Sequence, residues 1–271
     1  MNNDVTSRAA TFHRLHQGGL LLLANAWDAG SARLIESLGA PAIATTSAAV
    51  AWSHGYPDGD HLPIRVLTAT IAEITRVIRV PLSVDFEGGY SSDPAIVAEN
   101  VAQLIDAGAV GINLEDGNGT AALCCAKIDQ VKRTAARLGV KLFINARIDV
   151  YLHALVPAEH RLEETVARAA RYRAAGVDGI FVPGVVDAPT IKTLVAEVKL
   201  PLNVLARSGL PSAPELAALG VRRLSAGSGL ASASYGRITT LATDFLKNGV
   251  SASLAEGALT YAGLNTLMGS R

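Results

Sequence analysis

Short apolar runs alternate with segments of helical period along almost the whole chain. The segment at residues 93–109 shows the helical pattern, because Val97, Val101 and Leu104 recur at spacings of four and three. The apolar runs have the length of buried strands and occupy eight ranges: 21–27, 41–47, 81–87, 110–116, 141–147, 179–184, 201–206 and 222–227. The pattern therefore predicts eight strands in alternation with helices.

Eight strand–helix units without a linker predict a single α/β domain spanning residues 1–271, built as a (β/α)8 TIM-type barrel. An open doubly wound sheet is the alternative, but it usually carries a glycine-rich turn after its first strand, and "NAWDAGSA" is a poor match. The first residues read as a short N-terminal helix. The chain continues past the eighth strand as a helical extension with one helix more than a barrel needs, and we expect this last helix to pack elsewhere, for example on another subunit.

Composition narrows the class of protein. Hydrophobic residues make up 49% of the chain, and 24 basic residues balance 24 acidic ones. This balance predicts no nucleic-acid partner, and the absence of an apolar run of about 18 residues predicts no membrane span. The N-terminus lacks a secretory signal pattern, and the adjacent Cys124 and Cys125 give no evidence of a disulfide framework. We therefore expect a soluble, cytoplasmic protein.

Polar residues end several of the predicted strands, where a barrel of this type places its active site. The run "SVDFEGGY" ends in Asp85 and Glu87, the next strand ends in Glu115, and the fifth ends near Arg147. Clustered carboxylates without histidine or cysteine suit Mg²⁺ or Mn²⁺, and a nearby arginine suits an anionic substrate. A carboxylate at a strand end can instead cap a helix or pair with an arginine, and we favour that interpretation for Asp116 and Asp149.

The ordered set "NAWDAGSARLIESLGAPAIATTSAAVAWSHGYPDGD", "VDFEGGY", "GINLEDG" and "INARID" resembles the isocitrate lyase/phosphoenolpyruvate mutase superfamily over nearly the whole chain. The resemblance implies a Mg²⁺ site, with Mn²⁺ as a substitute. By resemblance, Asp85 binds the ion directly, Glu87 replaces a second aspartate that acts through metal-bound water, and Glu115 holds further metal waters.

The same resemblance implies the substrate contacts. Asp58 of "GYPDGD" corresponds to a catalytic aspartate on a mobile loop, and Arg147 to the substrate-binding arginine, which together with Glu115 would act in catalysis. Asp85 would also contact the substrate through the metal. Backbone N–H groups would hold a substrate carboxylate at Thr46, Ser47 and Ala48.

The chain differs from the superfamily at the positions that distinguish the reactions of its members. Isocitrate and methylisocitrate lyases carry a Lys-[Lys/Arg]-Cys-Gly-His gating loop, whereas this chain reads "GNGTAALCCAKID". Phosphonate-processing members carry a lysine at the position of Gly117, and several lyases carry a glutamate at Pro183. The chain therefore resembles the methylisocitrate lyase-like branch with an atypical gating loop, and a role for Cys124 or Cys125 stays open.

These features lead to one expected function and two alternatives. We expect a Mg²⁺-dependent carbon–carbon lyase that acts on a small 2-oxo or 2-hydroxy di- or tricarboxylate, like isocitrate, methylisocitrate or oxaloacetate, through the enolate of a 2-oxo acid. The alternatives are phosphoenolpyruvate or phosphonopyruvate chemistry, as a mutase or hydrolase, and a non-catalytic barrel that binds 2-oxo acids. The resemblance also implies a homodimer or homotetramer whose last helix is exchanged between subunits.

Overall fold

The computed structural model describes residues 3–269, and its centre is one sheet of nine parallel strands. The first predicted strand is split into β1 (Leu21–Leu23) and β2 (Asn25–Ala26). β1 pairs with β9 (Arg223–Ser225) and β2 pairs with β3 (Ile43–Thr45), so this segment brings the two ends of the sheet together. The remaining strands follow in chain order: β4 (Leu82–Asp85), β5 (Gly111–Glu115), β6 (Phe143–Arg147), β7 (Gly179–Phe181) and β8 (Leu202–Leu205). The predicted (β/α)8 barrel is confirmed.

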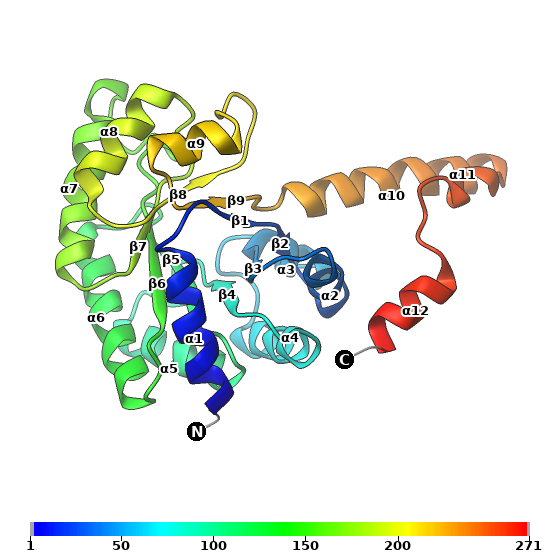
Figure 1. Cartoon of the computed structure of the whole chain (residues 1–271), viewed down its shortest axis with the longest axis horizontal. Coiled ribbons are helices and arrows are strands. Elements are labelled where there is room, and N and C mark those ends of the chain that lie inside the picture. The colour runs from blue at the N-terminus through cyan, green and yellow to red at the C-terminus, as the bar shows by residue number, and fades with distance from the viewer. Residues whose placement is uncertain (1–2, 270–271) are drawn as a thin grey trace.

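Helices surround this sheet (Figure 1). After the short leading helix α1 (Asn3–Leu15), they are α2 (Ala29–Ser37), α3 (Ser47–Ser53), α4 (Ile64–Val77), α5 (Pro94–Asp106), α6 (Ala121–Arg137), α7 (Arg161–Ala174), α8 (Ala188–Val198) and α9 (Ala213–Leu219), with a 3-10 turn η1 (Ala158–His160) before α7. α1 covers the starts of β5 and β6, because the fully buried Phe12 meets Phe143 edge to face at 5.4 Å between ring centroids.

Local sequence signals set the helix ends. Asp93 caps α5 by accepting a hydrogen bond from the N–H of Ala95 at 2.8 Å, and Pro94 occupies the first helical turn. Gly108 follows the same helix with φ of 103°, and a Cβ atom there would lie 2.5 Å from Cγ2 of Thr75. Only glycine fits this position, which explains why the predicted helix of residues 93–109 stops at Asp106.

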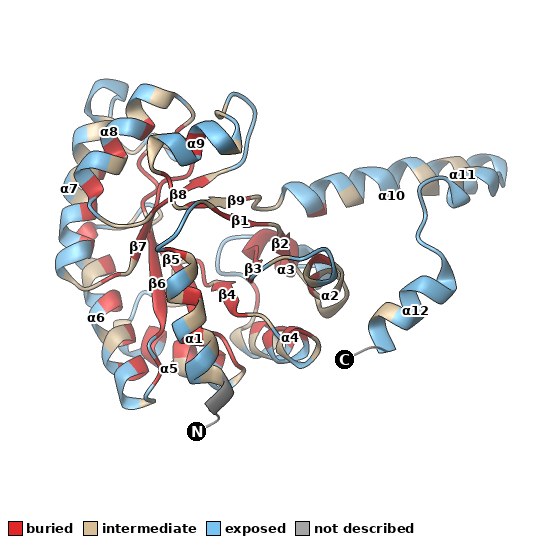
Figure 2. Ribbon diagram, in the orientation of Figure 1, coloured by how far each residue is buried: buried red, intermediate tan, exposed pale blue. Residues whose placement is uncertain are grey.

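Strand residues alternate between two buried environments. Outward residues such as Ile112, Leu114 and Ile144 are apolar and pack under the helices, where the core lies (Figure 2). Inward residues are polar over much of the barrel lumen, and Asn113 and Arg223 reach one another across it from β5 and β9. The barrel thus has an apolar outer layer and a polar interior beneath its carboxyl end.

Three C-terminal helices extend beyond the barrel: α10 (Gly229–Asn248), α11 (Ala252–Ala255) and α12 (Tyr261–Gly269). Figure 1 shows α10 leading away from the barrel and α12 returning toward α2. Arg33 of α2 donates from Nε to the carbonyl oxygen of Leu267 at 3.2 Å, so α12 contacts its own chain. None of the helices in the described part of the chain is long and apolar enough to cross a membrane.

Candidate active site

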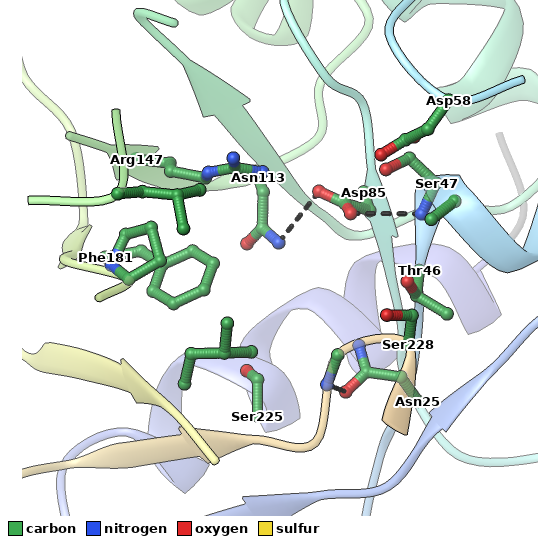
Figure 3. A pocket seen from close by; sticks show the side chains of 15 residues that line it. Asn25, Thr46, Ser47, Asp58, Asp85, Asn113, Arg147, Phe181, Ser225 and Ser228 are labelled. Carbon is green, nitrogen blue, oxygen red and sulfur yellow. Dashed lines mark hydrogen bonds between the residues drawn. The ribbon is translucent and has the colours of Figure 1, made fainter. Parts of the chain in front are cut away.

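A cavity of about 120 Å³ opens at the carboxyl ends of the strands (Figure 3). Six of the eight predicted site residues line it: Thr46, Ser47, Ala48, Asp58, Asp85 and Arg147. They form part of a polar wall, which Asn25, Asn113, Ser225 and Ser228 complete. The apolar lining residues, which we call the apolar wall, are Leu152, Phe181, Pro183 and Leu205. Phe181 pairs with Arg147 across β7 and β6, and Leu205 pairs with Ser225 across β8 and β9, so polar and apolar lining residues are neighbours.

Asp85 lies at the end of β4 and is fixed by hydrogen bonds on both carboxylate oxygens. Its Oδ2 accepts from the backbone N–H of Ser47 at 3.0 Å, and its Oδ1 accepts from Nδ2 of Asn113 at 3.1 Å. The backbone N–H of Asp85 in turn donates to Oγ1 of Thr45 at 2.8 Å. Figure 3 shows the carboxyl group of Asp58 close to Asp85 and Ser47. Burial and the charge of Asp85 raise the pKa of Asp58.

Glu87 is buried beside the cavity, and its carboxylate fastens the loop that carries Asp58. Its Oε2 accepts from the backbone N–H groups of Gly59, at 2.8 Å, and Asp60, and its Oε1 accepts from the hydroxyl of Tyr90 at 2.6 Å. Asp60, Glu87 and Tyr90 all have positive φ, at 60°, 47° and 59°. Three left-handed non-glycine residues in one cluster indicate a strained segment, as is common at functional sites.

The acidic surroundings also change the proton affinity of Glu87. Burial raises its pKa to about 7, and the charges of Asp58 and Asp60 add to the effect. The segment is tied to α6 as well, because Nζ of the buried Lys127 donates to the carbonyl oxygen of Gly88 at 2.6 Å.

Arg147 projects from the end of β6 between two carboxylates. Its Nη1 lies 2.5 Å from Oε2 of Glu115, and its Nε donates to Oδ1 of Asp149 at 2.7 Å. Burial raises the pKa of Glu115 to about 8, the charges of Asp149 and Asp85 add to this, and Arg147 opposes it. With this pKa, Glu115 is mostly protonated at neutral pH in the metal-free protein, and a cation bound nearby would favour its ionised form.

The donor set around the cavity fits a hard cation with a partial water shell. Among residues 3–269, no group of three or more His, Cys, Asp or Glu side chains lies close enough to hold a metal together. Asp85 and Asp58 are the two carboxylates that line the cavity. Magnesium takes one or two carboxylates directly and keeps several waters, so this pair suits it. Participation of Glu87 and Glu115 through metal-bound waters stays a prediction.

The structural interpretation of Asp116 agrees with its contacts. Its Oδ2 accepts from Nη1 of Arg168 at 2.9 Å and from the hydroxyl of Tyr172 at 2.7 Å. Its Oδ1 accepts from the backbone N–H of Asp149 at 2.9 Å. The carboxylate therefore ties the end of β5 to α7 and to the loop after β6.

The two cysteines lie in the first turns of α6, where the resemblance implied a gating loop. Cys124 is buried and Cys125 is partly exposed. Burial raises the pKa of the Cys124 thiol to about 12, so it stays protonated at neutral pH. Neither cysteine is among the residues that line the cavity.

Several lining residues are not among those predicted from the sequence. Asn113 lies two positions before Glu115 on β5, so strand alternation alone places both side chains on the inner face. Gly227 and Ser228 follow β9, and the N–H of Gly227 donates to Oδ1 of Asn25 at 2.9 Å. The apolar wall carried no such signal, because Phe181 and Leu205 read as ordinary core residues in their strands.

Comparison with known proteins gives the chain its family. The model of the phosphoenolpyruvate phosphomutase family matches residues 12–246. An uncharacterised protein of Mycobacterium tuberculosis (strain ATCC 25618 / H37Rv) is 39% identical over 223 residues, which cover 80% of this chain and 82% of that protein. An oxaloacetate decarboxylase of Paraburkholderia xenovorans (strain LB400) is 31% identical over 221 residues, covering 77% of this chain and 70% of the enzyme.

A solved structure gives the same result. A Burkholderia cenocepacia J2315 protein, described as a candidate phosphonomutase, superposes with a TM-score of 0.83 and 40% identity. The superposition covers 88% of this chain and 99% of that one. The chain belongs to the phosphoenolpyruvate phosphomutase family.

Proposed function

We propose that this protein is a Mg²⁺-dependent carbon–carbon lyase that cleaves a small 2-oxo acid through its enolate. The observation that carries the proposal is the cavity at the carboxyl ends of the strands, which Asp85 and Arg147 line together with apolar side chains. Its volume of about 120 Å³ suits a small acid. The relative named oxaloacetate decarboxylase, at 31% identity, supports this reaction class.

Each polar residue has a role in this proposal. Asp85 would hold Mg²⁺ directly, with Asp58, Glu87 and Glu115 around its waters, and Mn²⁺ would substitute. Bound Mg²⁺ supplies a Lewis acid that stabilises negative charge developing on the 2-oxo oxygen. Arg147 would grip a substrate carboxylate, because a guanidinium matches a carboxylate with two parallel hydrogen bonds.

A substrate carboxylate would also meet the start of α3, where Thr46, Ser47 and Ala48 line the cavity and their backbone N–H groups would bind it. The N–H of Ser47 donates to Oδ2 of Asp85 at 3.0 Å and that of Thr46 to the carbonyl oxygen of Ala26 at 3.1 Å, so the substrate would compete with these acceptors. Asp58 lines the cavity close to Asp85, and its carboxyl group would deliver the proton that the enolate carbon takes up after cleavage.

The apolar wall favours a reaction that releases an uncharged fragment. A departing anion would be desolvated against Leu152, Phe181 and Leu205, and an unpaired charge is costly in such surroundings. A carboxylate that leaves as carbon dioxide loses its charge in the same step. Decarboxylation of an oxaloacetate-like acid is therefore the version of lyase chemistry that we expect first.

Phosphoenolpyruvate or phosphonopyruvate chemistry is the second candidate, and the family match favours it. The cavity offers a phosphoryl group little cationic support, because Arg147 is the one cationic side chain among the described residues that line it. That guanidinium already faces Glu115 and Asp149. The scarcity of cationic side chains therefore favours lyase chemistry over phosphoryl chemistry.

A substrate panel tests the function. The protein with Mg²⁺ is incubated with C4 to C7 2-oxo and 2-hydroxy acids, while pyruvate, glyoxylate and carbon dioxide are followed. We expect turnover of at least one acid, and Asp85→Asn should lower kcat by at least about a hundredfold, the scale of lost electrostatic stabilisation. Asp106→Asn, at an exposed position on α5, is the matched control and should retain activity.

Two outcomes would overturn the proposal in different ways. Turnover of phosphonopyruvate, without turnover of any acid, would establish the phosphonate alternative. Binding of Mg²⁺ together with a 2-oxo acid, with no conversion of any compound, would establish a non-catalytic binding barrel.

We also propose that the protein assembles as a homodimer or homotetramer through its C-terminal helices. Large apolar side chains are exposed along this segment, including Ile238, Phe245, Leu246 and Tyr261. Exposed apolar surface of this extent is typical of protein–protein contacts.

A further inference from the structure

Arg223 is the largest fully buried side chain in the described part of the chain, with 1% of its surface exposed. It projects from β9 into the barrel lumen, directly below the floor of the cavity. Its Nε donates to Oγ of Ser225, and its Nη2 donates to Oδ1 of Asn113, each at 3.2 Å. Both acceptors line the cavity. The guanidinium therefore contacts the cavity floor from beneath.

No carboxylate compensates this charge at close range. Among the described residues no ion pair joins the Arg223 guanidinium to a carboxylate, and its Nη1 has no hydrogen-bond partner. The charge of Asp85 favours the charged guanidinium without forming an ion pair with it. His16, which also lies near Arg223, has its pKa lowered to about 3 by burial and is neutral. Burial lowers the pKa of Arg223 to about 10, so the guanidinium still carries its charge at neutral pH.

A buried cation without a close partner is destabilising, so fold stability does not explain this residue. Its contacts do point to a role at the cavity. Oδ1 of Asn113 accepts from both Arg223 and Nδ2 of Asn145, the latter at 2.9 Å. With two donors on its oxygen, the Asn113 amide must turn its NH₂ group toward Asp85.

The charged side chains around the cavity include one guanidinium that is already shared between two acids. Asp58 and Asp85 line the cavity and Glu115 lies beside it, whereas Arg147 is shared between Glu115 and Asp149. An anionic substrate would therefore meet the Asp85 carboxylate and a guanidinium that is already shared. A guanidinium without a close ion-pair partner, in surroundings of low dielectric, acts over a longer distance than a paired one.

We propose that Arg223 is a positioning residue that makes the cavity floor electropositive and orients Asn113, so that an anionic 2-oxo acid or its enolate binds above it. The inference rests on the proposed function, because it takes that anion as the occupant. Arg223 touches no substrate itself and acts through Asn113 and Ser225.

Oxalate is a suitable probe, because it presents the two adjacent charged ends of an enolate of a 2-oxo acid. Its affinity for the protein is measured by calorimetry at saturating Mg²⁺, and Mg²⁺ is titrated separately without oxalate. Arg223→Met removes the charge and keeps an unbranched side chain. We expect oxalate to bind about tenfold more weakly, through loss of a favourable charge interaction, while Mg²⁺ alone binds no more weakly.

Two further variants complete the comparison. Arg223→Lys retains the charge, so its affinity for oxalate should stay within about threefold of the wild-type affinity. In binding free energy, a threefold loss is less than half of a tenfold loss. Arg222→Met alters the adjacent position, outside the described cavity lining, and should change neither titration.

The results separate the two proposals. If wild type binds oxalate and Arg223→Met binds it equally, the role of Arg223 is disproved and the proposed function stands. If Arg223→Met weakens Mg²⁺ binding as much as oxalate binding, the residue maintains the shape of the site, and the electrostatic role is disproved. If Arg223→Met does not fold, a tenfold loss in Arg223→Lys overturns the inference and a loss within threefold supports it. If wild type does not bind oxalate with Mg²⁺, both proposals fail.

Discussion

At the scale of single residues, Glu87 links the strained loop to the pH response of the protein. Its pKa is about 7 in the folded protein, against an ordinary value of 4.5. Between these values the folded state binds more protons than the unfolded state, so the free energy of unfolding falls as the pH rises. From pH 5 to pH 8, the titration of Glu87 should lower the free energy of unfolding of the metal-free protein by at most about 3 kcal/mol, since one pKa unit corresponds to about 1.4 kcal/mol.

Glu87→Gln tests this expectation, because glutamine keeps an oxygen for the backbone N–H groups of Gly59 and Asp60 and has no charge to lose. Urea unfolding of both proteins in EDTA, at pH 5 and pH 8, should show a smaller loss of stability for the variant. Glu197→Gln, at an exposed position of α8, is the control and should follow wild type. Equal losses in Glu87→Gln and wild type would show that Glu87 does not titrate in this range.

At the scale of elements, Gly179 on β7 has no side chain, and this leaves room for the side chain of Asn145 on the neighbouring strand β6. A Cβ atom on Gly179 would lie 2.9 Å from Oδ1 of Asn145 and 3.1 Å from Cε1 of Phe143. Gly179→Ala should therefore displace Asn145, which donates to Asn113. We expect a loss of about 1–3 kcal/mol in the free energy of unfolding, typical of overpacking, and weaker oxalate binding.

A second glycine provides the control for this variant. Gly236 lies inside α10, and a Cβ atom there would meet no atom within 4 Å. Gly236→Ala should raise the free energy of unfolding by up to about 1 kcal/mol, the difference in helix propensity, and leave oxalate binding unchanged. Urea unfolding and calorimetry measure both variants. A Gly179→Ala protein as stable as wild type would show that β7 has room for the methyl group.

At the scale of the whole molecule, the C-terminal helices leave apolar surface without cover in a single chain. Leu246 on α10 has 83% of its surface exposed and Phe245 has 47%. Leu246→Glu should therefore convert the proposed oligomer to a monomer at micromolar concentration, because burial of the introduced charge would oppose association. Light scattering coupled to size-exclusion chromatography measures the mass directly.

The control for assembly lies on the same helix. Thr240→Glu introduces the same charge at an exposed position on another face of α10 and should leave the oligomer intact. A wild-type protein that is monomeric at micromolar concentration would contradict the proposed assembly, and an oligomeric Leu246→Glu variant would show that this face lies outside the interface.

The sequence alone determined the architecture, because a buried parallel strand must be apolar and its helices must be amphipathic, and both leave periodic patterns. All eight predicted strands are present. The pattern also placed Asp85 and Arg147 at strand ends, which share one edge of a barrel. The break at Ala24 between β1 and β2 was not visible, because pairing with two different neighbours is a property of closure.

Tertiary structure decided which of the polar residues face the same space. Glu87 is two positions from Asp85, yet its carboxylate is held by the loop at Gly59 and Asp60, far along the sequence. The apolar wall and the buried charge of Arg223 arise only when strands distant in sequence meet across the lumen. Local periodicity records whether a residue is buried, but not what it is buried against, and the chemistry of a site depends on the latter.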